Sequence, residues 1–392
     1  MNKIYMDNAA TTPVRNEVLE AMIPYYGELY GNPSSLYQTA SLSKRAVEHA
    51  RAQVADALGA KPDEIYFTGG GTESDNWALI GAADGCGKEG GHIITTSIEH
   101  HAVLHTCRYL EEKGFDITYL PVDAEGLVTV RELEQAIRPD TFLISVMFAN
   151  NEIGTIQPIK EIGRLAKERN ILFHTDAVQA VGHIPIDVNV LNIDLLSLSA
   201  HKIYGPKGVG VLYVRKGTKL KSFIHGGAQE RGRRAGTENV PGIVGMGHAI
   251  ELVSAEMREE NKRLIPLRDR LIEEILTAVP NARLNGHRTE RLPGNVNISF
   301  EFVEGESILL LLDTKGIAAS SGSACTSGSL DPSHVLLAIG LPHENAHGSI
   351  RLTLGRHNTE SEVNEVIREL PPIIERLRGM SPLYEDFIST QR

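Results

Sequence analysis

Short apolar runs separated by stretches of helical spacing fill residues 43–214 of the chain. Helical spacing is clear at Ser43–Leu58, which Gly59 ends, and again after Gly71 through Ala83. The apolar runs have the length of strands, and they are Glu64–Thr68, His92–Thr96, Asp116–Leu120, Thr141–Phe148, Ile171–Thr175, Leu195–Leu198 and Val209–Val214. This alternation predicts an α/β domain with a mostly parallel sheet.

The pattern changes after residue 244. A long helical stretch, Val244–Leu276, contains Pro266, which is expected to bend or divide it. Beyond it the spacing predicts strands and helices in a different order: strand Asn295–Phe302, helix Glu306–Asp313, strands Ile317–Ser320 and Ser349–Leu354, and helix Glu360–Arg378. This order predicts a smaller α+β domain. We therefore expect a large domain of residues 15–260 and a small domain of residues 1–14 and 261–392.

Composition narrows the class of protein. Hydrophobic residues at 41% and charged residues at 23% are ordinary for a globular protein. The net charge of −11 and the absence of a long basic run disfavour nucleic acid and anionic membranes as partners. The start, Met1–Asp7, turns polar before any apolar stretch long enough for a signal peptide or a membrane span, so a cytoplasmic location is expected.

The three cysteines, Cys86, Cys107 and Cys325, form an odd set without CxxC spacing, which argues against a disulfide framework or a zinc knuckle. Cys86 and Cys107 lie in or beside helical patterns, where a free cysteine acts as a small hydrophobe. Cys325 lies in a Ser/Gly-rich run, residues 320–329, with almost nothing to bury. We interpret it as a thiol nucleophile on a loop that must move.

Polar residues follow several of the predicted strands. In open α/β sheets ligands bind at the carboxyl ends of the strands, where loops and helix N-termini converge. The residues in question are Thr72, His100, Asn150, Asn151, Asp176, Gln179, Ser199, His201 and Lys202. Lys202, in Ser199–Lys202 before the turn Gly205–Gly208, is a candidate for Schiff-base formation, because a partly desolvated amine becomes nucleophilic. The alternative is a surface lysine in a loop.

Gly69–Thr72, between a strand and a helix, has the composition of a phosphate cup formed by backbone N–H groups and a hydroxyl. The alternative is an N-capping turn with Thr72 as the cap. No Lys-Ser/Thr pair follows at P-loop spacing, which disfavours a nucleoside triphosphate.

A buried carboxylate at Asp176 needs a partner, and a protonated pyridine nitrogen would suit it as well as a helix cap or salt bridge would. Adjacent His100 and His101 point in different directions, so a ring contact with a ligand is favoured over a zinc site. Arg351, in the apolar strand Ser349–Leu354, needs an anion, which is either a substrate carboxylate or an acidic residue of the chain.

Taken together, these stretches resemble the pyridoxal-phosphate-dependent cysteine desulfurases of iron–sulfur cluster assembly, within the class V aminotransferase group. The resemblance runs nearly end to end, and its most specific motifs are Ser199–Lys202 (Ser-x-His-Lys) and Ser321–Cys325 (Ser-Gly-Ser-Ala-Cys). The latter points to the branch with a long, mobile cysteine loop. The resemblance implies a fold type I PLP-transferase, like aspartate aminotransferase, with a seven-stranded, mostly parallel sheet in its large domain.

The resemblance also implies roles for individual residues. Pyridoxal 5'-phosphate would be held covalently by Lys202, with Asp176 on the pyridine nitrogen and His100 stacked on the ring. The remaining expected contacts are Gln179 and Asn150 near the ring hydroxyl, Gly71, Thr72, Ser199 and His201 at the phosphate, Thr237 at the phosphate of the partner subunit in a homodimer, and Asn32 and Arg351 at the substrate carboxylate. The sequence departs from the usual pattern of this family at Tyr37, Ala40, Gly69 and Gly71.

The implied reaction converts L-cysteine to L-alanine and leaves a persulfide on Cys325. The sulfur would pass to an iron–sulfur scaffold or another acceptor protein, and Cys325 could also ligate a transient cluster. A class V aminotransferase and a selenocysteine lyase are the enzymatic alternatives, and a catalytically silent assembly scaffold is the non-enzymatic one. The sequence leaves nitrogenase maturation, general cluster assembly and tRNA thiolation open as pathways.

Overall fold

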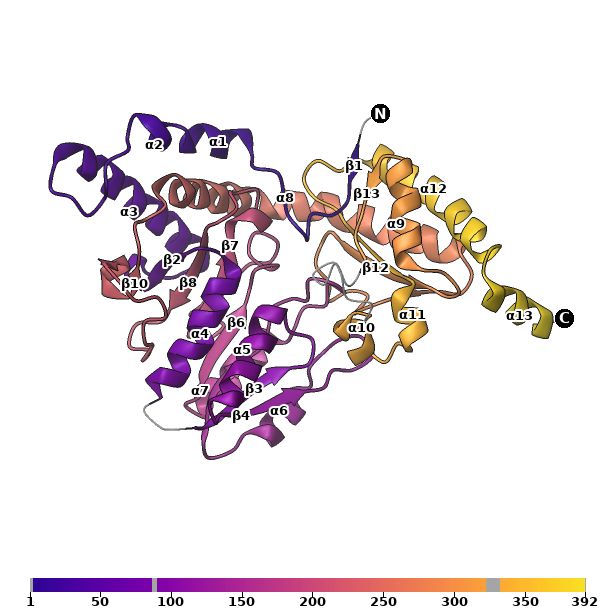
Figure 1. Cartoon of the computed structure of the whole chain (residues 1–392), viewed down its shortest axis with the longest axis horizontal. Helices are drawn as coiled ribbons and strands as arrows, with labels where there is room; N and C mark the ends of the chain where they lie inside the picture. The colour runs from indigo at the N-terminus through magenta and orange to yellow at the C-terminus, as the bar shows by residue number, and fades with distance from the viewer. Residues whose placement is uncertain (1–2, 87–89, 322–331, 392) are drawn as a thin grey trace.

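The computed structural model describes residues 3–86, 90–321 and 332–391, and it contains a seven-stranded sheet in the order β2-β8-β7-β6-β5-β3-β4 (Figure 1). The predicted Cys325 loop lies largely outside these residues. The sheet strands are β2 (Ile65–Thr68), β3 (His92–Thr96), β4 (Asp116–Leu120), β5 (Thr141–Ser145), β6 (Leu172–Asp176), β7 (Leu195–Ser199) and β8 (Gly210–Val214). β8 runs antiparallel to both of its neighbours, β2 and β7, and the remaining pairs are parallel. The predicted α/β fold with a mostly parallel sheet of seven strands is confirmed.

Helices cover both faces of this sheet. Neighbouring strand residues point to opposite sides: Ile93 belongs to the apolar cluster beneath α4 (Gly71–Gly85) and α5 (His101–Glu112), whereas Ile94 belongs to the cluster of the other face. Burial on both faces explains the continuous apolar runs in the sequence. The other helices of this half are α1 (Asn16–Met22), α2 (Pro24–Gly27), α3 (Gln38–Leu58), α6 (Val130–Ala136) and α7 (Ile159–Glu168).

A second apolar core lies around a three-stranded antiparallel sheet, β11 (Ala282–Leu284), β12 (Asn295–Phe300) and β14 (Ser349–Thr353). A separate two-stranded parallel pair joins β1 (Ile4–Tyr5) to β13 (Ile317–Ala318), so the start of the chain packs with its last third. The helices here are α9 (Gly305–Thr314), α10 (His334–Ala338), α11 (His343–His347), α12 (Glu360–Arg378) and α13 (Pro382–Gln391). The division into domains at residues 15–260 and 261–392 stays a prediction.

Helix α8 (Val240–Ala278) connects the two cores. Its N-terminal half contributes Ile250 to the core of the large sheet, and its C-terminal half contributes Leu271 to the second core. The helix is 39 residues long and continues through Pro266, so the prediction that this proline could divide it is wrong. The helix begins at Val240, four residues before the predicted start at Val244. Asn239 caps it, because the Asn239 side chain accepts a hydrogen bond from the Gly242 N–H at 3.1 Å.

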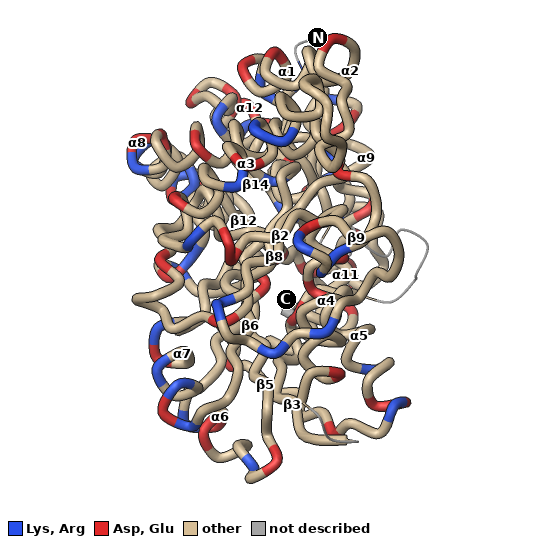
Figure 2. Tube along the Cα trace, turned by 90° about the vertical axis from the view of Figure 1, so that its left-hand side faces the viewer, with Lys and Arg blue, Asp and Glu red and all other residues tan. Residues whose placement is uncertain are grey.

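Acidic and basic residues are interspersed along the outer helices (Figure 2). No helix among the described residues is both long enough and apolar enough to cross a membrane.

Candidate active site

A cavity of about 270 Å³ lies at the carboxyl ends of β6 and β7. The walls come from the N-terminal segment, the start of α4, the loops after β3 and β5, and β14. Residues that line it are Ala9, Ala10, Gly71, Thr72, Asp75, His100, Met147, Ala149, Asn151, Asp176, Val178, Gln179, Ser199, His201, Lys202 and Arg351. Most of the polar residues predicted from the strand ends therefore meet in one place, as the topology of parallel strands requires.

Lys202 enters this cavity from a short 3₁₀ turn, Ala200–Lys202, that follows β7 directly. Its Nζ donates hydrogen bonds to the carbonyl oxygens of Ala9 at 2.5 Å and Ala10 at 2.7 Å. Gln179 Nε2 donates to the same Ala9 oxygen at 3.0 Å. The N-terminal segment thus lies against the lysine, and Lys202 is a half-buried group in a cavity instead of a lysine on an exposed loop.

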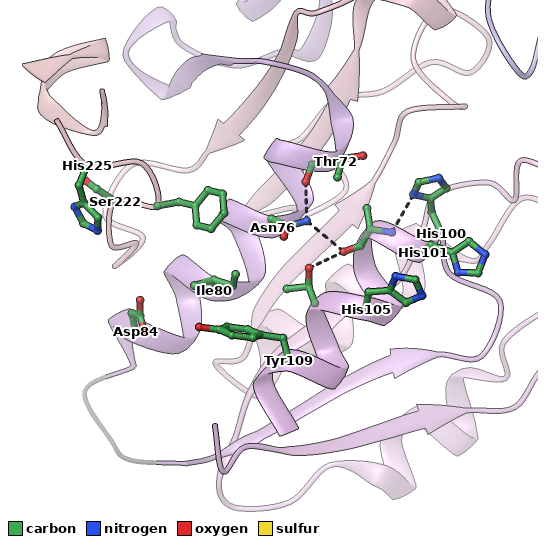
Figure 3. A pocket seen from close by; sticks show the side chains of 13 residues that line it. Thr72, Asn76, Ile80, Asp84, His100, His101, His105, Tyr109, Ser222 and His225 are labelled. Atoms are coloured by element: carbon green, nitrogen blue, oxygen red, sulfur yellow. Dashed lines mark hydrogen bonds between the residues drawn. The ribbon is translucent and has the colours of Figure 1, made fainter. Parts of the chain in front are cut away.

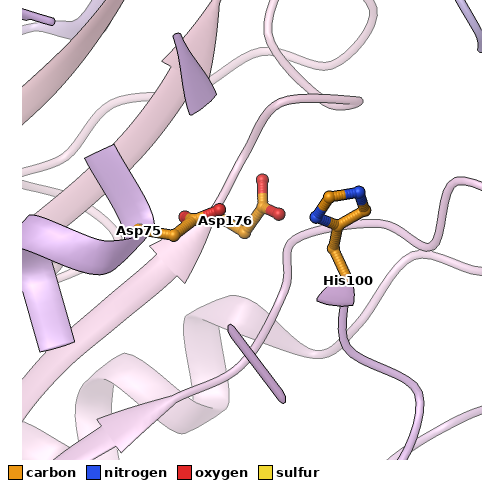
Figure 4. A group of neighbouring side chains, drawn as sticks. All are labelled: Asp75, His100 and Asp176. Atoms are coloured by element: carbon orange, nitrogen blue, oxygen red, sulfur yellow. The ribbon is translucent and has the colours of Figure 1, made fainter. Parts of the chain in front are cut away.

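Asp75, His100 and Asp176 face one another (Figure 4), and all three line the same cavity as Lys202. One carboxyl oxygen of each aspartate and one ring nitrogen of His100 lie within 4.8 Å of one another. Asp176 ends β6, and its Oδ1 accepts a hydrogen bond from the Val178 N–H at 2.9 Å. Burial raises the pKa of Asp176 to about 6, although this N–H and the Lys202 charge act in the opposite direction.

The surroundings of Asp75 and His100 favour the neutral form of each side chain. Burial, reinforced by the charge of Asp176, raises the pKa of Asp75 well above its usual range. Burial and the nearby Lys202 charge lower the pKa of His100 to about 4. His100 caps α5, where its Nδ1 accepts a hydrogen bond from the Ala102 N–H at 3.1 Å. Since Nδ1 accepts, the neutral ring carries its proton on Nε2.

His174, on the same strand as Asp176, links three neighbouring strands of the sheet. His174 on β6 bonds to Ser145 Oγ at 2.8 Å and to Ser197 Oγ at 3.0 Å, which ties β5, β6 and β7 together. Its Nε2 also lies 3.6 Å from Asp75 Oδ1. Burial lowers the pKa of His174 to about 3. The ring is therefore neutral, and this contact with Asp75 is not an ion pair.

The first turn of α4, Ser199 and His201 form another part of the cavity wall. The N-cap of α4 is Gly70, with φ of 151°, so Thr72 lies inside the first turn and is not the cap. A Cβ added to Gly71 would come within 2.7 Å of Val178 Cγ2, so the cup is closely shaped around this glycine. His201 Nδ1 lies 3.1 Å from Thr11 Oγ1, and burial lowers the pKa of the His201 ring to about 4.

Arg351 reaches the cavity from β14. The sequence left two anionic partners open for it, a substrate carboxylate and an acidic residue of the chain. Its guanidinium pairs with Asp7 Oδ1 at 3.0 Å and donates to the Asn151 carbonyl oxygen at 2.9 Å. Its Nε is buried without a hydrogen-bond partner among the described residues. The arginine therefore has an internal ion pair and also lines the wall of the cavity.

Three predicted residues that the structure describes, Asn32, Asn150 and Thr237, do not line the cavity of this chain. Asn150 is buried beside it, and its side chain is occupied by the Ile98 carbonyl oxygen and by the N–H groups of Glu152 and Ile153. Asn32 and Thr237 are exposed in other parts of the chain, and Cys325 lies outside the described residues. The roles assigned to these residues stay predictions. Among the residues that do line the cavity, Asp75 and Asn151 had no role assigned from the sequence.

Comparisons with known proteins agree with this arrangement. Residues 4–366 match the aminotransferase class-V family. Cysteine desulfurase IscS of Methanosarcina thermophila is 64% identical over 97% of this chain and 94% of the relative. Cysteine desulfurase IscS of Clostridium botulinum is 59% identical over 100% of this chain and 99% of the relative.

Solved structures give the same picture. One described as a NifS-like protein superposes with a TM-score of 0.90 at 43% identity, over 95% of this chain and 100% of that one. Another, SspA in complex with cysteine, superposes with a TM-score of 0.80 at 43% identity, over 91% of this chain and 100% of that one.

With a family match over most of its length, this chain belongs to the class-V aminotransferases, which are enzymes that depend on pyridoxal 5'-phosphate. Within that family, the relatives described above carry the name cysteine desulfurase.

The cavity fits the cofactor in its donor set. An amine suited to a covalent bond, the Asp176 carboxyl group and a neutral imidazole all line the same cavity. Its volume is close to the lower end of small-molecule pockets, which is roughly 300 Å³.

Proposed function

We propose that this protein is a cysteine desulfurase that converts L-cysteine to L-alanine and retains the sulfur as a persulfide. The observation that carries the proposal is the convergence of Lys202, Asp176 and His100 on one cavity, in a chain that is 64% identical to a cysteine desulfurase. A structural neighbour described as a complex with cysteine supports the choice of substrate.

In this proposal, Lys202 anchors the cofactor, Asp176 faces its ring nitrogen and the His100 ring lies against it. Gln179 and Asn150 act near the ring hydroxyl. The phosphate contacts would come from Gly71, Thr72, Ser199 and His201, with Thr237 reaching the phosphate site of the partner subunit in a homodimer. When bound, pyridoxal phosphate supplies an electron sink that stabilises negative charge on the substrate α-carbon.

Three side chains, those of Asp176, His100 and Lys202, supply the charge, the hydrogen bond and the base that the reaction needs. Asp176 has a pKa of about 6, so it is largely ionised near pH 7 and can stabilise a positive charge in front of it. The neutral His100 ring carries its proton on Nε2, which can donate a hydrogen bond into the cavity. Once its amine is released, Lys202 is the base placed to take the substrate α-proton, and the Ala9 and Ala10 carbonyls orient it.

Arg351 and Asn32 would hold the substrate carboxylate. For Arg351 this requires a change from the ion pair with Asp7 or a contact through its unpartnered Nε. The thiolate of Cys325 would attack the substrate sulfur and break its bond to carbon. The sulfur remains on Cys325 as a persulfide, and protonation of the carbon yields alanine.

Purified protein incubated with L-cysteine tests this proposal through the alanine and sulfide formed. Lys202→Ala should lose the Schiff-base absorption band and all turnover. Cys325→Ala should keep the band and lose turnover. Full turnover in Cys325→Ala together with a retained band in Lys202→Ala would refute the assigned roles. A keto acid product would favour a class V aminotransferase, and faster turnover of L-selenocysteine would favour a selenocysteine lyase.

The same proposal includes a homodimer in the cytoplasm and an iron–sulfur scaffold as the sulfur acceptor. Analytical ultracentrifugation of the protein and capture of a persulfide-accepting scaffold from the same cell would test these parts separately.

A further inference from the structure

Histidines gather at the start of α5, outside the roles assigned above. His101 and His105 lie four residues apart on this helix, so they share one face of it. Both line a pocket of about 750 Å³ next to the cofactor cavity, and Figure 3 shows their rings beside each other at its edge. His334 at the start of α10 packs against His101.

Two of the nearby histidines, His100 and His334, already form hydrogen bonds with the backbone. His100 caps α5 through its Nδ1. His334 Nε2 bonds to the Glu99 carbonyl oxygen at 3.0 Å. The His101 ring, by contrast, has a buried Nδ1 with no hydrogen-bond partner among the described residues. A buried polar atom without a partner costs free energy, so this nitrogen needs a hydrogen-bond partner or, in the tautomer that leaves its lone pair free, a cation.

The spacing of the His101 and His105 rings matches shared coordination of one ion. Their centroids are 5.0 Å apart, with an angle of 35° between the ring planes. With a metal–nitrogen bond of about 2.1 Å, a ring centroid lies about 3.2 Å from the metal, and two ligands at about 100° then have centroids about 5 Å apart. Two histidines at i and i+4 on one helix face are a common arrangement for binding zinc.

We propose that His101 and His105 chelate a divalent transition cation of the kind that prefers imidazole, such as Zn²⁺, Ni²⁺ or Co²⁺, with water completing the coordination shell. Imidazole nitrogen suits these ions, whereas Mg²⁺ and Ca²⁺ prefer oxygen ligands. The site is separate from the cofactor cavity, although both pockets include Thr72 and His100 in their walls.

Titration of the chelator-treated holoenzyme with Zn²⁺, followed by calorimetry without L-cysteine, tests the site directly. His105→Ala is the main variant, because His105 is exposed and its loss should leave the fold intact. We expect at least a tenfold loss of Zn²⁺ affinity in His105→Ala and in His101→Ala. The Zn²⁺-dependent rise of the melting temperature that we expect in the wild type should be absent from both variants.

Two controls separate this site from other ligands. The pair His343 and His347 on α11 has ring centroids 4.8 Å apart, so His343→Ala/His347→Ala is a matched variant at a similar spacing. Co²⁺ absorption distinguishes nitrogen ligands from thiolate, since a sulfur ligand adds a strong near-ultraviolet band. Unchanged affinity in His105→Ala, loss of binding in His343→Ala/His347→Ala alone, or a thiolate band that disappears in Cys325→Ser would each overturn the proposal. None of these measurements depends on turnover, so they stand or fall independently of the proposed desulfurase activity.

Discussion

The carboxyl groups of Asp75 and Asp176 lie within 4.8 Å of each other in the cavity wall, yet their environments favour different charges. Asp176 has a backbone N–H and the Lys202 charge to stabilise its ionised form. Asp75 is buried next to that carboxylate, and both its burial and the Asp176 charge raise its pKa and so favour its protonated form. This pairing favours a single negative charge on the two carboxyl groups, because like charges at this distance resist double ionisation.

Asp176→Asn should lower the rate of alanine formation far more than Asp75→Asn does. The first change removes the charge that we propose faces the cofactor, and loss of one partner of a buried charge pair costs about 3–5 kcal/mol, which corresponds to a loss of about 100-fold or more. Asp75→Asn replaces a carboxyl group whose surroundings favour its neutral form by a neutral group of the same shape. Equal losses of turnover in the two variants would contradict the assigned charges.

Gly71→Ala should weaken cofactor binding. The added Cβ would meet Val178 Cγ2 at 2.7 Å, and both residues line the cavity, so Val178 must move within it. We expect a higher dissociation constant for pyridoxal phosphate in fluorescence titrations of the apoprotein. Gly71→Ala/Val178→Ala removes the clash and should recover most of the affinity. A double variant as weak as the single one would show that the backbone of the glycine matters instead.

Glu99→Gln should change how stability depends on pH. Burial raises the pKa of Glu99 to about 8 from its usual value near 4.5. Between these values the folded state binds a proton that the unfolded state has released, so this group makes the free energy of unfolding fall as pH rises, by at most about 1.4 kcal/mol per unit. Gln removes that slope and can still accept from Thr96 Oγ1 and the Met147 N–H, the two donors to Glu99.

The difference between wild type and Glu99→Gln across pH 5–8 is the quantity to measure by urea unfolding. Buried histidines such as His174, whose pKa is lowered, act in the opposite direction, and the difference cancels them. Parallel curves for the two proteins would mean that Glu99 is ionised in the folded state.

Glu230→Gln should destabilise the fold by up to about 3–5 kcal/mol, the cost of removing one charge of a buried pair, since Arg51 then keeps only the half-exposed Glu48 as a carboxylate partner, at 3.2 Å. Glu230 receives two hydrogen bonds from Arg51, at 2.8 and 3.0 Å, and each side chain is 2% exposed. Arg51→Met/Glu230→Leu replaces both charges by apolar groups and should recover most of the loss. Thermal unfolding of the three proteins measures both effects. A loss below about 1 kcal/mol in Glu230→Gln would mean that the pair is more hydrated than its burial indicates.

The apolar runs predicted the large sheet well, since most of its strands are buried on both faces, with the edge strand β4 partly exposed. β3 and β4 have the predicted bounds: Gly91 and Ser97 flank β3, and Pro121 follows β4. Short elements such as β11 and α10 were not predicted, since three to five residues carry too little periodicity. α3 begins at Gln38 instead of Ser43, and its first turn packs tightly against Gly31, a tertiary contact that no local pattern contains.

The sequence predicted the site residues that lie at or just after the end of a strand, such as Asp176 and Lys202. It did not distinguish between neighbouring residues of the same type. Asn150 and Asn151 have the same side chain, and only the turn of the backbone decides that Asn151 lines the cavity while Asn150 bonds to the loop. Asp75 lies one turn into α4, and its proximity to Asp176 depends on how that helix packs on the sheet.

The pairing of β1 with β13 has a consequence for synthesis of the chain on the ribosome. Ile4 pairs with Ile317, so the first strand has no partner until most of the protein has been made. The large sheet, complete by Val214, can form earlier, because domains fold as their residues emerge. The segment that follows β1 includes Ala9 and Ala10, which contact Lys202. During synthesis Lys202 is therefore positioned by the large sheet before β1 pairs with β13 and the segment with Ala9 and Ala10 is held against it. Full activity should appear only after release of the finished chain.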